Sequence, residues 1–230
     1  MLQLPKVIGH RGAAAYAPEN TLDSFREARR RGATWVEIDV KLTSDSVPIL
    51  MHDASLKRTT GVDRLVAETR AVDLPKSVPT FEAAIACFQE LGVGCNVEIK
   101  PCEGRAAETA RITVETLRRC WPKQLPAPLL SSFVDVSLAT ALAAAPEFDR
   151  AILLGEIGDD WLSRTQAVKA RGVNTNGKKL TAPRAVEVRK AGYALSVYTI
   201  NEGDVAQALV GMGVDCVITD APDVILKALA

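Results

Sequence analysis

Short β-branched and apolar runs alternate with longer amphipathic stretches along nearly the whole chain, and this alternation restricts the fold more than any other feature. Such alternation is typical of α/β proteins with mostly parallel strands. The expected strands are residues 6–10, 34–40, 47–51, 95–99, 129–132, 151–154, 173–176, 194–199 and 216–219. The expected helices are residues 21–31, 80–91, 106–119, 137–145, 161–171, 182–191 and 202–211, and several of them end in glycine, as at Gly92 and Gly172. Because no linker or repeat interrupts the pattern, we expect a single domain over residues 1–230.

The connection between Val40 and Val47 decides which α/β fold is expected. Its six residues, KLTSDS, are too few for a crossover between parallel strands, which takes about a dozen residues, but they can close a hairpin. Residues 47–51 are therefore expected to be the return arm of a hairpin after the second strand. Without this arm eight strands remain, the number that a closed (β/α)8 TIM barrel requires. The alternative is a doubly wound open sheet.

Three acidic residues lie where barrel strands are expected to end. Glu37 and Asp39 are two positions apart and therefore share one face of their strand, and Glu98 lies on another strand. Crowded carboxylates raise each other's pKa unless a cation compensates them. Their oxygen atoms suit hard ions such as Mg²⁺ or Ca²⁺ better than Zn²⁺. Each acid alone is more simply explained by an ion pair or a capped turn, but the trio favours a site for one divalent cation.

Both histidines of the chain lie at expected strand ends, His10 in GHRG and His52 in LMHD. If the hairpin turns around Asp45 and Ser46, His52 lies opposite Asp39. Histidine titrates near pH 6.5, so one imidazole can act as a base and the other as an acid at neutral pH. The sequence leaves open which is which.

Polar residues near His10 extend this candidate site. Arg11 offers a forked donor for phosphate oxygens. The segment PENT at residues 18–21 has a plain explanation as a helix start capped by Asn20 or Thr21. Within it, Glu19 is the residue expected to do more, by orienting the site.

Charge and composition exclude several classes of partner. Basic and acidic residues both number 28, so nothing supports binding to nucleic acid. No apolar run approaches the length of a membrane span, and the N-terminus lacks the pattern of a secretory signal. The five cysteines are odd in number and lack CxxC spacing, which favours reduced thiols. We therefore expect a cytoplasmic protein without membrane insertion, as a monomer or a homo-oligomer.

An ordered set of motifs resembles the glycerophosphodiester phosphodiesterase family, with the strongest similarity to bacterial cytoplasmic enzymes associated with glycerol-3-phosphate uptake. The motifs are HRG (10–12), PENT (18–21), EID (37–39), HD (52–53), EIK (98–100), LLSSF (129–133), VYTIN (197–201) and GVDCVITDAPD (213–223). This resemblance implies a phospholipase-C-like barrel that hydrolyses small glycerophosphodiesters to sn-glycerol 3-phosphate and an alcohol.

The resemblance also implies a role for each matching residue. It implies acid and base catalysis by His10 and His52, and binding of one Mg²⁺ or Ca²⁺ by Glu37, Asp39 and Glu98. It further implies phosphate binding by Arg11 and Lys100, a place for Tyr198 on the alcohol side, and a supporting role for Glu19 and Asn20. Many relatives carry Trp at the position of Tyr198 and a longer segment after His52, so the preferred alcohol is left open.

Two other functions compete with this one. A phosphoinositide- or sphingolipid-type lipase of the same superfamily would need an apolar rim to meet a membrane, and the sequence shows no amphipathic insertion of that kind. A catalytically silent barrel that binds a metabolite would be expected to have lost a histidine or an acidic residue of the set, and none is missing.

Overall fold

A computed structural model describes residues 2–230. Its strands are β1 (Val7–Gly9), β2 (Trp35–Leu42), β3 (Pro48–Leu50), β4 (Gly94–Ile99), β5 (Leu129–Ser132), β6 (Asp149–Leu154), β7 (Gly172–Asn176), β8 (Ala194–Tyr198) and β9 (Cys216–Thr219). Its α-helices are α1 (Leu22–Arg30), α2 (Lys57–Thr60), α3 (Phe81–Leu91), α4 (Ala106–Cys120), α5 (Asp135–Ala144), α6 (Trp161–Ala167), α7 (Ala182–Lys190), α8 (Gly203–Gly211) and α9 (Pro222–Ala228). Two 3₁₀ turns, η1 (Val66–Glu68) and η2 (Ala71–Asp73), lie between α2 and α3.

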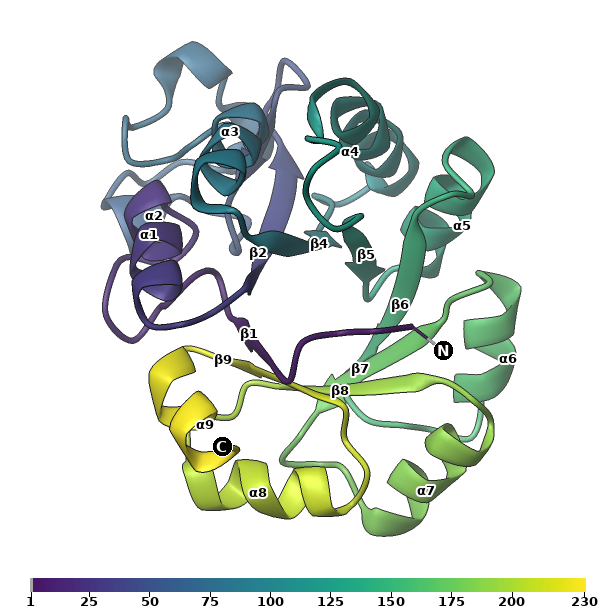
Figure 1. The fold of residues 1–230 in the computed structure, drawn as a ribbon. Helices are drawn as coiled ribbons and strands as arrows, with labels where there is room; N and C mark the ends of the chain where they lie inside the picture. Colours follow the sequence, from purple (N-terminus) through teal and green to yellow (C-terminus); the bar gives the residue numbers. More distant parts are fainter. Residues whose placement is uncertain (1) are drawn as a thin grey trace.

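The strands form one sheet in the order β1-β9-β8-β7-β6-β5-β4-β2-β3, and pairing of β1 with β2 closes it. All pairs are parallel except β2 with β3. Figure 1 shows the closed ring of strands with the larger helices around its outside. The predicted (β/α)8 barrel, with a hairpin after its second strand, is confirmed.

Local sequence signals account for several helix ends. Thr21 caps α1 and Thr80 caps α3, since each side-chain oxygen accepts a hydrogen bond from the backbone N–H three residues on. The helix α3 ends at Leu91 and is followed by Gly92, whose left-handed backbone (φ 64°) favours glycine. Gly172 was expected to end a helix but begins β7, and α6 already ends at Ala167. The helices α2 and α9 were not expected.

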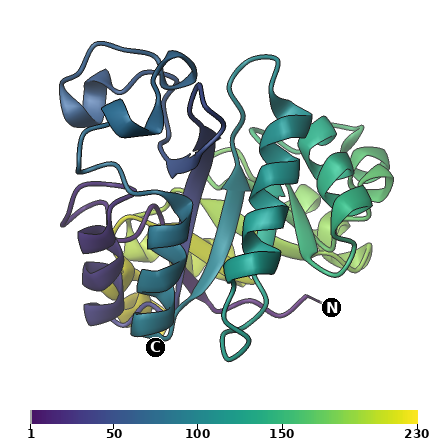
Figure 2. The same ribbon diagram turned by 90° about the horizontal axis from the view of Figure 1, so that it is seen from above.

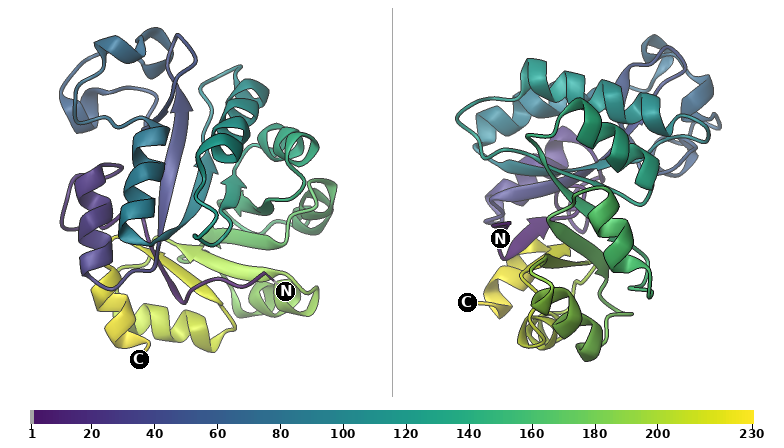
Figure 3. Two further views of the ribbon diagram at one scale, coloured as in Figure 1. Left: turned by 45° about the horizontal axis from the view of Figure 1, so that its top comes forward. Right: turned by 90° about the vertical axis from the view of Figure 1, so that its right-hand side faces the viewer.

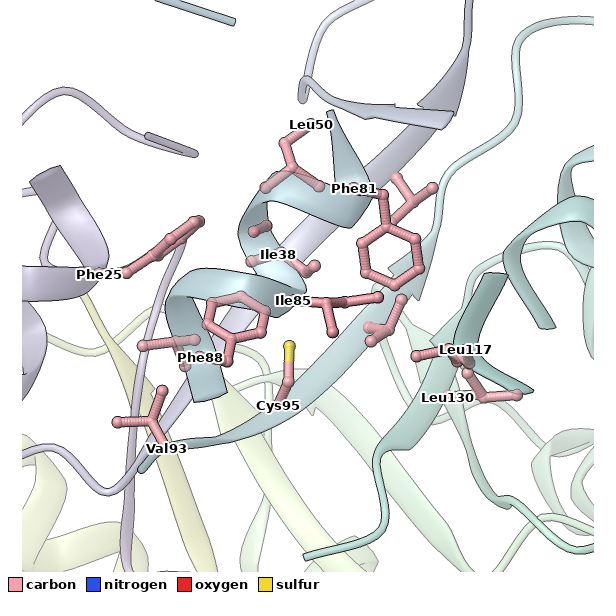
Figure 4. Close-up of a cluster of buried hydrophobic side chains, with 14 of the residues drawn as sticks. Phe25, Ile38, Leu50, Phe81, Ile85, Phe88, Val93, Cys95, Leu117 and Leu130 are labelled. Carbon is pink, nitrogen blue, oxygen red and sulfur yellow. The ribbon is translucent and has the colours of Figure 1, made fainter. Parts of the chain in front are cut away.

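Alternation along β2 separates an apolar outer face from a polar inner one. Val36, Ile38 and Val40 are fully buried and belong to the cluster beneath α1 and α3. In that cluster Phe25 and Phe88 meet edge to face with ring centroids 5.0 Å apart, and Figure 4 shows them beside Ile38. Truncating a buried phenylalanine to alanine costs about 3–5 kcal/mol. This packing therefore fixes the strand whose other face carries Glu37 and Asp39.

The hairpin between β2 and β3 is shifted by one residue from its predicted register. Val40 pairs with Leu50, so Met51, not His52, lies opposite Asp39, and the Met51 N–H donates to the Asp39 carbonyl at 3.0 Å. The reason is a three-residue loop centred on Asp45, closed by a bond from Thr43 N–H to the Val47 carbonyl. The predicted register assumed a turn centred between Asp45 and Ser46. His52 therefore lies after the paired residues of β3, and the loop between β3 and α2 determines its position.

Different segments cover the two ends of the barrel. The segment that carries α2, η1 and η2 lies beyond the carboxyl ends of β2 and β4, as Figures 2 and 3 show. The segment before β1 crosses the opposite end (Figure 1), where Leu4 and Trp35 pack against a cluster that contains Ile8. Among residues 2–230, no helix combines the length and apolar character that crossing a membrane requires.

Candidate active site and metal centre

Three buried carboxylates meet inside the barrel near the carboxyl ends of its strands. The register of β2 and β4 places Glu37 beside Asn96 and Asp39 beside Glu98. Glu37, Asp39 and Glu98 are all buried, and each offers an oxygen atom within 4.8 Å of the others'. The alternation that turns the valines and Ile38 outward turns these acids inward.

The electrostatics of the trio fit a divalent cation. Burial raises the pKa of Glu37 well above its usual value, and Asp39 and Glu98 raise it further. Burial and Asp39 raise the pKa of Glu98 to about 7. Burial would also raise the pKa of Asp39, but Lys100 at 3.3 Å and Arg11 at 3.2 Å outweigh it and the pKa is lowered. Two of three carboxyl groups thus resist ionisation without a cation, and oxygen donors suit Mg²⁺ or Ca²⁺.

We expect the cation-free protein to lose stability as the pH rises. The pKa of Glu37 and that of Glu98 are raised above the value of about 4.5 in the unfolded chain, so the contribution of both groups is fully present below that pH. The contribution of Glu98 is lost as pH rises through about 7, and that of Glu37 is lost as pH rises through its own raised pKa. The thermal midpoint of chelated protein should therefore fall between about pH 5 and pH 8. Adding Mg²⁺ or Ca²⁺ should restore it far more at about pH 8 than at pH 5. Equal stabilisation at both pH values would contradict this account.

His10 is held by a carboxylate that directly follows the last barrel strand. Its Nδ1 lies 2.7 Å from Asp220 Oδ1, directly after β9. Asn201 fixes Asp220 by donating to Oδ2 at 2.8 Å and by accepting from its backbone N–H at 2.9 Å. The His10 Nε2 atom lies 4.0 Å from Glu37 Oε2. Sequence reasoning gave Asp220 and Asn201 no role, although both lie within the quoted motifs.

His52 is held in the same way, through a longer chain of ion pairs. Its Nδ1 lies 2.7 Å from Asp53 Oδ1, and burial lowers the pKa of His52. Arg58 of α2 donates to both oxygens of Asp53, at 2.6 and 3.1 Å. Arg58 also donates to both oxygens of Glu19 at 2.7 Å, and Glu19 in turn accepts from Arg11 at 2.8 Å. Arg58 thus links Asp53, which contacts His52, to Glu19, which contacts Arg11.

Arg11 and Asn20 adopt left-handed backbone conformations that turn the chain around the carboxylates, with φ of 50° and 56°. The Arg11 N–H donates to Glu37 Oε2 at 3.1 Å. The Asn20 side chain donates to Asp39 Oδ2 at 2.9 Å and accepts from the Asp39 N–H at 3.2 Å. The PENT segment therefore both starts α1 and contacts the acidic site.

A cavity of about 240 Å³ collects most of the predicted site residues. The predicted residues that line it are His10, Arg11, Glu37, His52, Glu98, Lys100 and Tyr198. Lys100 Nζ donates to Glu98 Oε1 at 2.8 Å, and Tyr198 donates to the Leu154 carbonyl at 2.9 Å while its ring meets Phe133 edge to face. Asp39 is buried beside Glu98, and Glu19 and Asn20 contact Arg11 and Asp39. A larger cavity of about 490 Å³ shares His52 with this one.

Comparison with known proteins agrees with this geometry. The Glycerophosphoryl diester phosphodiesterase family model matches residues 10–224. A glycerophosphodiester phosphodiesterase of Bacillus altitudinis is 25% identical over 241 residues, which cover 97% of this chain and 98% of the relative. A phosphodiesterase of Oleispira antarctica, solved in complex with the product sn-glycerol-3-phosphate, is 36% identical with a TM-score of 0.95, and the match covers 98% of this chain and 97% of that one. The glycerophosphodiester phosphodiesterase of Thermotoga maritima shares the fold, with a TM-score of 0.81 at 23% identity over 99% of both chains.

Proposed function

Because this chain belongs to the glycerophosphodiester phosphodiesterase family and is an enzyme of that kind, we propose that it releases sn-glycerol 3-phosphate and an alcohol from small glycerophosphodiesters by acid and base catalysis with two histidines. The observation that carries this proposal is that His10 and His52 line one cavity together with Glu37 and Glu98. The product seen with the Oleispira antarctica relative supports the choice of substrate.

We propose that Glu37, Asp39 and Glu98 hold one divalent cation, Mg²⁺ or Ca²⁺. Support comes from the closeness of their oxygen atoms and from the raised pKa of Glu37 and of Glu98. When bound, such an ion supplies Lewis acidity and positive charge beside the phosphate.

Arg11 and Lys100 bind the phosphate in this scheme. Within residues 2–230 the buried Arg11 Nε atom has no hydrogen-bond partner, although Asp39 lies 3.2 Å away. The ammonium group of Lys100 donates a hydrogen bond to Glu98, and Lys100 lines the same cavity. An ammonium group has three donors, so it retains capacity for a phosphate oxygen. Donors fixed in a site of low dielectric stabilise the charge that develops on the non-bridging oxygens.

The two histidines transfer protons through their Nε2 atoms. A carboxylate beside Nδ1 favours the tautomer that carries its proton there, so Nε2 has a free lone pair in the neutral ring. One imidazole removes the proton of the attacking hydroxyl group, and the other gives a proton to the alcohol oxygen that leaves. The same assignment serves attack by water and attack by the neighbouring hydroxyl of the glycerol.

Arg58→Gln is expected to lower kcat by about ten- to a hundredfold with a smaller change in KM, because both Asp53 and Glu19 lose a bidentate partner and the reacting groups shift. Steady-state kinetics with a soluble glycerophosphodiester measure this effect. The matched control is Lys57→Gln on the same helix, which removes only an exposed pair with Asp63 and should leave kcat near the wild-type value. If both variants lose activity equally, Arg58 has no positioning role.

The proposed function is tested by coupled detection of sn-glycerol 3-phosphate. Glycerophosphocholine, glycerophosphoethanolamine and glycerophosphoglycerol are supplied with Mg²⁺ or Ca²⁺, and phosphatidylcholine vesicles are supplied in parallel. We expect release of sn-glycerol 3-phosphate from the soluble diesters and no turnover of the vesicles. No release from any soluble diester would refute the proposal, and selective turnover of the vesicles would favour a lipase.

A further inference from the structure

Two polar side chains in the wall of the catalytic cavity have unused hydrogen-bonding capacity. Asn96 of β4 is 1% exposed and Ser131 of β5 is fully buried. Both line the cavity that contains the two histidines. The Asn96 Oδ1 atom and the Ser131 Oγ atom have no hydrogen-bond partner among residues 2–230.

The strand register places this pair directly beside the acidic site. Asn96 pairs with Glu37 across β2 and β4, and Ser131 pairs with Glu98 across β4 and β5. Asn96 and Glu98 share the inner face of β4 because they are two residues apart, and Asn96 lies farther from the carboxyl end of the strand. Asn96 is therefore deeper in the barrel than Glu98, whereas Ser131 lies at the level of Glu98 on the neighbouring strand.

Buried polar groups without partners are rare because they lose their hydrogen bonds to water and gain none in the protein. An amide oxygen and a hydroxyl group together accept and donate, which matches hydroxyl groups of a ligand. Under the proposed function, the substrate carries two free hydroxyl groups on its glycerol end. A site built to hydrogen-bond hydroxyl groups discriminates against an analogue that lacks them, since its own polar atoms then stay unpaired.

We propose that Asn96 and Ser131 form the subsite for the free hydroxyl groups of the glycerol moiety and select polyol phosphates over alkyl phosphates. This proposal rests on the proposed function. The cavity of about 240 Å³ that these residues line is small, which suits a short three-carbon chain. The glycerol phosphate end is common to all glycerophosphodiesters, so this subsite leaves the alcohol end free to vary.

The test compares two ligands that differ only in the hydroxyl groups. The dissociation constants of sn-glycerol 3-phosphate and propyl phosphate are measured by titration calorimetry with Mg²⁺ present. Asn96→Ala and Ser131→Ala should each weaken binding of sn-glycerol 3-phosphate about five- to tenfold. Binding of propyl phosphate should change by less than about twofold. Asn174→Ala is the matched control and should affect neither ligand. In the described part of the chain, the buried Asn174 side chain also has no hydrogen-bond partner, but it lies outside the residues that line the cavity.

Each other outcome overturns the proposal. Equal weakening of both ligands would indicate general damage to the phosphate site, and no weakening of either would mean that the two groups bind only water. If Asn174→Ala weakened binding as much as the other two variants, the loss of any buried polar side chain in the barrel would lower ligand affinity, and the subsite would not be specific. Ser131→Ala removes a single oxygen atom. If Asn96→Ala lowers the thermal midpoint of the protein, the affinities of Ser131→Ala therefore decide the test. Wild-type enzyme that produces sn-glycerol 3-phosphate while its variants keep full affinity refutes the subsite alone, whereas wild-type enzyme without that activity refutes the function itself.

Discussion

Replacing His52 with alanine is expected to lower kcat about 100- to 10,000-fold, the usual contribution of a positioned acid or base. The imidazole lines the same cavity as His10, and Asp53 holds its Nδ1 atom. His10→Ala should show a loss of the same order, because Asp220 holds the ring of His10 in the same manner.

The fold should survive either substitution. The side chain of His52 is 32% exposed and that of His10 is 17% exposed, and neither belongs to the apolar core. Thermal midpoints close to wild type would confirm this. Asp53→Asn is the graded control, since it keeps the imidazole and removes only the carboxylate, and its loss of kcat should be smaller than that of His52→Ala. Near-normal turnover of a histidine variant would remove that residue from the mechanism.

Asp39→Asn is expected to reduce both cation binding and turnover on the order of a thousandfold, since several kcal/mol of charge stabilisation are lost. Asp39 keeps a lowered pKa inside the barrel, which makes it the acid best prepared to bind a cation. An amide has nearly the same shape, so the local change is the loss of the negative charge that faces Lys100 at 3.3 Å and Arg11 at 3.2 Å, together with a weaker hydrogen bond from Asn20. The measurements are titration calorimetry with Mg²⁺ and Ca²⁺ and steady-state kinetics.

A surface aspartate provides the comparison for this variant. Asp149 begins β6 and pairs with Arg171 at 3.0 Å, away from the cavity that the histidines line. Asp149→Asn should bind the cation and turn over substrate like the wild type. If Asp39→Asn bound the cation with the same affinity as the wild type, the ion would bind at a site that does not include Asp39.

The architecture could be predicted because its signals are local. Strand and helix periodicity, together with the six-residue connection 41–46, determined a barrel with a hairpin. Alternation along β2 and β4 correctly placed Glu37, Asp39 and Glu98 on one inner surface. Hydrophobic packing on the outer face makes that alternation obligatory, since a shift by one residue would bury the acids against the helices.

The errors lie where non-local contacts or fine loop geometry decide. A loop of three residues instead of two shifted the hairpin by one and placed Met51 opposite Asp39. The support of His52 by Arg58 and Glu19 joins residues 39 positions apart, and no periodic pattern marks the segment that carries Arg58. Asp53 was adjacent to His52 in the sequence, but only the ring orientation shows that it holds Nδ1.

Cleavage of the phosphodiester is proposed to require a cation that three buried carboxylates hold, and this requirement is the basis of the mechanism. It is tested most directly by following release of sn-glycerol 3-phosphate from glycerophosphocholine by wild-type protein before and after chelation, and again after Mg²⁺ or Ca²⁺ is restored. We expect the activity to vanish on chelation and to return with one ion bound per chain. Undiminished release in the presence of chelator, with no cation detected in the protein, would contradict the account.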